Sequence, residues 1–155
     1  MGIKRRQKVK KNKNLSSVIS IYYGTFSCSW VIIAPPHIEF HYFCRYEADK
    51  HYKIMSDYYP ELVIVNRYNH KNLHNIFESS SIVKVSTKDV NRFFEIKWKK
   101  KPEKIYIDYY LCIMRELEGL REYPEFKSLT QAIYTLYELE QTEFISRSLY
   151  IFDKD

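Results

Sequence analysis

Apolar and polar positions follow two different periods along this chain, and the first half has the period of a β-sheet. Short runs rich in β-branched and aromatic residues are typical of buried strands, and strict alternation indicates a strand with one polar face. These patterns predict strands at 17–23, 29–34, 37–47, 62–68 and 82–86. Because Gly24 and the pair Pro35-Pro36 leave only short turns between the first three runs, these strands should form an antiparallel meander.

Helical periods dominate the rest of the chain. They predict helices at 49–59, 70–78, 86–95, 102–117 and 128–143. We expect Gly119 to end the fourth helix in a left-handed conformation, and Ser128 and Gln131 to form a capping box at the start of the last. A meander followed by alternating units predicts an α/β fold, with a mixed five-stranded sheet flanked by helices. Functional sites of such sheets lie at the carboxyl ends of the strands.

Charge divides the chain into parts. Residues 1–14 carry seven Lys and Arg and no acid, although the whole chain of 155 residues has a net charge of only +6. The sequence therefore predicts a disordered basic arm at 1–14, one domain at 15–145 and a C-terminal tail at 146–155. Residues 15–104 are net positive and the last third is net negative.

Clustered cations are the strongest functional signal, since phosphate contacts dominate affinity for nucleic acids. Trp98 lies among lysines, where its ring could stack on an exposed base. A solubilising tail, a solvated loop or a nuclear-import signal would explain the same charges. The candidate nucleic-acid-binding residues are Lys4, Arg5, Arg6, Lys8, Lys10, Lys11, Lys13, Arg92, Lys97, Trp98, Lys99, Lys100, Lys101 and Lys104.

The cysteines and apolar runs bear on location. Cys28, Cys44 and Cys112 are odd in number and widely spaced, which favours reduced thiols in the cytoplasm or nucleus. No apolar run is long enough to span a bilayer, so no membrane association is expected. The composition, rich in Tyr and Phe and poor in Gly and Ala, also fits an AT-rich genome and would suit a viral protein.

Four local strings together resemble a known family. They are a strand, Gly turn and second strand at 20–32, a buried strand at 61–66, a strand, capped helix and Lys-rich loop from 83 to 104, and the start of a helix at 127–137. In order and spacing, over roughly residues 17–140, they are similar to RuvC-like and poxvirus-type Holliday-junction resolvases. The resemblance implies a ribonuclease H-like fold and a homodimer that binds branched DNA.

The resemblance also implies where catalytic acids should stand. The metal-ligand positions of the family fall on Tyr22, Asn66, Ser128 and Gln131, none of which is an acid. Two Mg²⁺ ions need anionic oxygen ligands, so we expect no metal, no cofactor and no catalytic residue here. Asp89, Asp108 and Glu61 are the acids that could replace the missing ligands. Asp89 is better explained as a helix cap, Asp108 lies mid-helix, and Glu61 lies at the wrong end of its strand.

The histidines do not form a convincing zinc motif. His37 and His41 are four residues apart on a predicted strand, which separates their rings by about 13 Å. His70 and His74 could share a helical face, but Lys71 stands where a metalloprotease has its Glu base, and no cysteine completes four ligands.

Three functions remain open. The first is a catalytically inactive, resolvase-like protein that binds structured or branched nucleic acid through the arm and the Lys-rich loop. The second is a structural or adaptor protein that keeps only the fold and binds a protein partner. The third is an active Mg²⁺-dependent junction endonuclease whose acids have moved to other positions.

Overall fold

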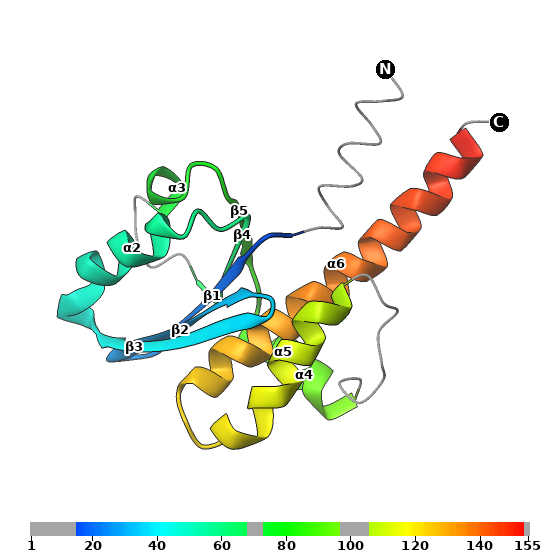
Figure 1. The fold of residues 1–155 in the computed structure, drawn as a ribbon. Coiled ribbons are helices and arrows are strands. Elements are labelled where there is room, and N and C mark those ends of the chain that lie inside the picture. The colour runs from blue at the N-terminus through cyan, green and yellow to red at the C-terminus, as the bar shows by residue number, and fades with distance from the viewer. Residues whose placement is uncertain (1–14, 68–72, 97–105, 154–155) are drawn as a thin grey trace.

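The five strands form one mixed sheet at the centre of the molecule (Figure 1). The structure is a computed structural model that describes residues 15–67, 73–96 and 106–153. Its strands are β1 (Val18–Tyr23), β2 (Ser27–Ala34), β3 (His37–Cys44), β4 (Leu62–Val65) and β5 (Ser81–Lys84). Their order is β3-β2-β1-β4-β5, with β1–β2 and β2–β3 antiparallel and β1–β4 and β4–β5 parallel. The predicted α/β class and five-stranded mixed sheet are confirmed.

Helices cover both faces of the sheet, because successive strand residues point to opposite sides. In β1, Val18 faces one apolar cluster, whereas Ile19 and Ile21 face the other. The helices α4 (Thr87–Ile96), α5 (Ile107–Leu117) and α6 (Glu125–Asp153) pack on the Val18 side. The helices α2 (Ala48–Asp57) and α3 (Leu73–Ile76) pack on the other side (Figure 1). Two cores therefore hold the sheet between them.

Strands β3, β4 and β5 end two or three residues earlier than the sequence predicts, and after β3 and β4 side chains take over the backbone pairing. The backbone N–H of Cys44 donates to Glu47 Oε1 at 3.3 Å, so β3 ends there and a 3-10 turn, η1 (Arg45–Glu47), follows. After Val65, the side chain of Asn66 rather than its backbone bonds to β1.

The start of α6 corrects the predicted capping box. Backbone N–H groups of Phe126 and Lys127 donate to the carbonyls of Tyr123 and Pro124, so the helix begins at Glu125. Ser128 is therefore inside the helix rather than at its N-cap, and it is fully buried together with Gln131. The helix continues to Asp153, past the boundary at 145 that we place from the sequence.

Other predicted helix ends have mixed outcomes. Ser86 Oγ accepts the backbone N–H of Asp89 at 3.4 Å, as expected of the cap of α4. The prediction for Gly119 is wrong: its φ is not positive, and α5 passes directly into a second 3-10 turn, η3 (Glu118–Leu120). Residues 1–14, 70–72 and 102–105, where we predict an arm and two helix starts, lie outside the described residues.

Candidate functional site

The first turns of α6 cross the carboxyl-terminal half of β1 and the adjoining amino-terminal half of β2, where they meet small polar residues. Ser29 Oγ on β2 lies 2.7 Å from Ser128 Oγ and donates to the carbonyl of Pro124 at 3.0 Å. Ser29 and Ser128 are 2 % and 0 % exposed, so water does not compete for these contacts. Helix α6 is thus attached to β2 by hydroxyl groups rather than by apolar packing alone.

One turn further along α6, Gln131 makes the corresponding contact with β1. Its Nε2 donates to the carbonyl of Ile21 at 2.9 Å and to Ser20 Oγ at 3.2 Å. A carbonyl oxygen can only accept, so the Ile21 contact fixes the orientation of the amide. Gln131 Oε1 is then left buried without a hydrogen-bond partner among the described residues.

Asn66 joins the ends of β4 and β1. Its Oδ1 accepts the backbone N–H of Tyr23 at 2.8 Å, and its Nδ2 donates to the carbonyl of Tyr23 at 3.1 Å. Its neighbour Arg67 donates from Nη2 to the carbonyl of Gly24 at 2.7 Å. Both polar atoms of the Asn66 amide are therefore used to hold the backbone.

Tyr22 lies on the α6 side of the sheet. It alternates with Tyr23, which belongs to the opposite core, and its register partner on β2 is Ser29. Tyr22 is only half-buried. The structure thus brings the four positions that the resemblance implies to the carboxyl end of β1 and β4: Tyr22, Asn66, Ser128 and Gln131.

These residues do not fit a pair of magnesium ions. Hard divalent cations need several oxygen ligands, including anionic ones, to offset their dehydration. At this end of the sheet the donor set is a phenol, two amides and a hydroxyl, and the amides already bond to the protein. Among the described residues no group of three or more His, Cys, Asp or Glu could hold a metal ion.

The three acids considered as replacements lie elsewhere. Glu61 accepts a bond from Ser16 Oγ at 3.1 Å just before β4, about 16 Å along the strand from Asn66. Asp89 is exposed in the first turn of α4, where Ser86 caps its N–H, and Asp108 is exposed in the first turn of α5.

Histidines on the other face of the sheet serve aromatic packing. His41 stacks on Trp30 with ring centroids 4.0 Å apart, and His51 stacks on Phe43 at 4.4 Å. Trp30 Nε1 donates to His51 Nδ1 at 3.0 Å. Burial lowers the pKa of His51, and the nearby His41 adds to the shift. His70 lies outside the described residues, which leaves the second pair of the zinc hypothesis untested.

Of the predicted nucleic-acid-binding residues, the structure describes one, Arg92, which is exposed on α4. The arm residues from Lys4 to Lys13 and the loop residues from Lys97 to Lys104 lie outside the described residues. The Lys-rich segment follows α4 in the sequence and begins five residues after Arg92.

Sequence reasoning missed several residues that form the polar network or line a pocket in the structure. Ser20 and Ser29 were readable as polar residues inside buried β-branched runs, which indicates that a partner must satisfy them. Arg121 and Lys127 line a pocket beside α4, together with Asn91 of that helix. Nothing in the sequence indicates that pocket, since its walls come from segments far apart in the chain.

Comparison with known proteins gives a structural likeness but no sequence match. No protein-family model matches the chain, and no curated protein matches its sequence. The structure is similar to that of RuvC from Thermus thermophilus, with a TM-score of 0.42 and 13% sequence identity. The match covers 85% of this chain and 96% of that one.

Proposed function

We propose that this protein binds structured or branched nucleic acid, DNA in the first instance, and does not cleave it by two-metal chemistry. The observation that supports the absence of cleavage is the neutral end of the sheet. There Ser128, Gln131 and Asn66 form hydrogen bonds with other residues of the protein. A nuclease of the resolvase type needs carboxylates there. We therefore assign no catalytic residue, metal or cofactor.

The basic segments support the binding half of the proposal. Arg92 is exposed near the middle of α4, the helix that precedes the Lys-rich segment in the chain, and the arm adds seven more cations. Clustered Lys and Arg bind phosphates in any sequence, because binding releases condensed counterions. Recognition of a branch rather than a duplex would then come from the rigid α/β frame, and a homodimer would match the two-fold symmetry of a four-way junction.

The binding test compares a labelled four-way junction with a duplex of the same sequence by fluorescence anisotropy across a salt series. We expect tighter binding to the junction. Lys99/Lys100→Ala should flatten the slope of log K against log salt by about two units if both lysines contact phosphates. The matched control is Lys50/Lys53→Ala, which removes the same charge from exposed positions of α2 on the opposite face.

Failure of the wild-type protein to bind either DNA at low salt would refute the binding proposal. Equal effects of the two double variants would show that net charge, not the Lys-rich segment, provides the affinity. Incubation of the junction with protein and Mg²⁺ or Mn²⁺ should give no product. Cleavage that follows the protein through purification would instead establish the active nuclease with relocated acids.

A second candidate, an adaptor that binds a protein partner, is favoured by α5. Ile107, Leu111 and Met114 are 44 %, 63 % and 44 % exposed, and their spacing puts them on one helical face. Such a stripe supports a protein contact, either with a second copy or with another chain. None of the three cysteines forms a disulfide bond, which is compatible with the reducing compartment that we propose. Among the described residues no helix has the length and apolar character needed to cross a membrane.

A further inference from the structure

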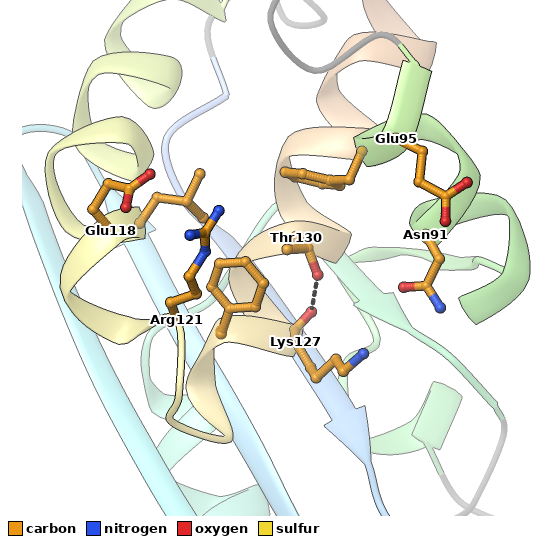
Figure 2. Close-up of a pocket in the computed structure, with 9 residues that line it drawn as sticks. Asn91, Glu95, Glu118, Arg121, Lys127 and Thr130 are labelled. Carbon is orange, nitrogen blue, oxygen red and sulfur yellow. Dashed lines mark hydrogen bonds between the residues drawn. The ribbon is translucent and has the colours of Figure 1, made fainter.

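A pocket of about 370 Å³ lies against the first turns of α6 (Figure 2). Its walls come from α4, from the end of α5 with η3, and from the first turns of α6. Phe94, Leu117 and Phe126 supply apolar surface. Small-molecule sites have volumes from this range upward and combine apolar walls with a few polar groups.

The charged side chains around this pocket balance one another. Arg121 and Lys127 provide two positive charges, and Glu95 and Glu118 provide two negative ones. These four charged groups make no side-chain hydrogen bond or ion pair with the residues that the structure describes, and the same is true of the side-chain amide of Asn91. Thr130, by contrast, is committed to the helix, since its hydroxyl donates to the carbonyl of Lys127 at 2.9 Å (Figure 2).

This combination selects a neutral, flat and polar-edged ligand. A phosphate group alone would meet two carboxylates, and an aliphatic chain would leave the polar rim without partners. A nucleobase has an apolar face for the phenylalanines and a rim of donors and acceptors for amide, guanidinium and carboxylate groups. Stacking of bases on aromatic side chains is common in proteins that bind unpaired strands.

We propose that this pocket receives one unpaired nucleobase of a bound nucleic acid. The inference rests on the proposed function, because it deepens the binding mode rather than standing apart from it. Phe94 and Phe126 contact the face of the base, and Asn91 and the two glutamates contact its edge. Arg121 and Lys127 reach the phosphates on either side of it. The pocket borders the last turn of α4, so a base held there lies next to the start of the Lys-rich segment.

The test uses a duplex with a three-nucleotide bulge and the same duplex with abasic sites at the bulged positions. Charge and shape are matched, and only the bases differ. The wild-type protein should bind the bulge with bases about tenfold more tightly, the value of one stacked base. Asn91→Trp puts bulk at the pocket from an exposed helical position, and should bring the two affinities together by weakening only the complex that contains bases.

The matched control is Asn75→Trp, the same substitution at an exposed position of α3 on the opposite face of the sheet, which should keep the tenfold preference. Equal wild-type affinity for the two duplexes would overturn the pocket inference while leaving nucleic-acid binding intact. Persistence of the preference in Asn91→Trp would place base recognition elsewhere and would also overturn it. Absence of binding to either duplex would instead refute the proposed function.

Discussion

Gln131→Glu tests whether the carboxyl end of the sheet can accept a negative charge. The substitution nearly preserves shape but replaces Nε2, which donates to the Ile21 carbonyl at 2.9 Å, by an oxygen. An ionised carboxylate would face that carbonyl at a position only 2 % exposed. A protonated carboxyl could still donate to it, and its second oxygen would take the place of Oε1, which in the wild type has no partner within the part of the chain that the structure describes.

The size of the effect follows from keeping the introduced carboxyl neutral. Its pKa is about 4.3 in the unfolded chain and is raised in the folded one by burial, so the penalty is absent below pH 4.3 and grows as the pH rises. Each pH unit above 4.3 costs about 1.4 kcal/mol, which gives about 4 kcal/mol at pH 7 if the folded pKa lies above 7. That is a large part of the 5–15 kcal/mol by which domains of this kind are usually stable.

Urea unfolding followed by circular dichroism, at pH values from 5 to 8, measures the difference from the wild type at each pH. The control is Gln131→Met, which removes the bond to Ile21 without adding a charge. It should cost about 1–3 kcal/mol at every pH. Wild-type stability of Gln131→Glu at pH 7 would refute the reasoning. So would selective stabilisation of this variant by Mg²⁺, because it would show that a cation can be seated there.

Two further predictions concern other parts of the molecule. Burial lowers the pKa of His51, so the stability contributed by its neutral form is complete above pH 6.5 and is lost as the pH falls through the folded pKa. His51→Phe should therefore lose less stability than the wild type between pH 6.5 and 5 in the same urea assay, and an unchanged decline would contradict this. If the exposed stripe on α5 contacts a second copy, the wild type should sediment as a concentration-dependent dimer and Leu111→Glu as a monomer. If the wild type stays monomeric at high concentration, the stripe does not bind a second copy.

The fold was predictable from sequence because its signals are local. Apolar runs and short turns determine which strands pair, so the meander and the five-stranded sheet follow from the residues themselves. The ends of the elements were less predictable. Side chains of Glu47 and Asn66 end β3 and β4 by taking backbone partners, and carbonyls of Tyr123 and Pro124 start α6 early. These side-chain and carbonyl contacts form only in the folded chain, so the spacing of apolar residues does not predict them.

The candidate sites were likewise predictable only where the signal was local in the sequence. The sequence identified four neutral positions, and the structure brings them to the carboxyl end of β1 and β4. It could not show that Ser20 and Ser29, far apart from α6 in the chain, are the partners that hold Ser128 and Gln131. The pocket over α6 was beyond sequence reasoning, because three separate segments make its walls and none carries a motif.

The polar end of the sheet and the pocket are lined by different residues of α6, and this separation has a consequence for binding. A cluster of carboxylates at the end of the sheet would repel phosphates unless divalent cations neutralised it. Here the corresponding residues are neutral, while the cations of Arg92, Arg121 and Lys127 lie on α4, on the turn after α5 and on α6. Phosphates near the end of the sheet therefore meet no cluster of carboxylates. Divalent ions should therefore affect binding only as ordinary salt does, by competing for phosphates rather than by completing a site.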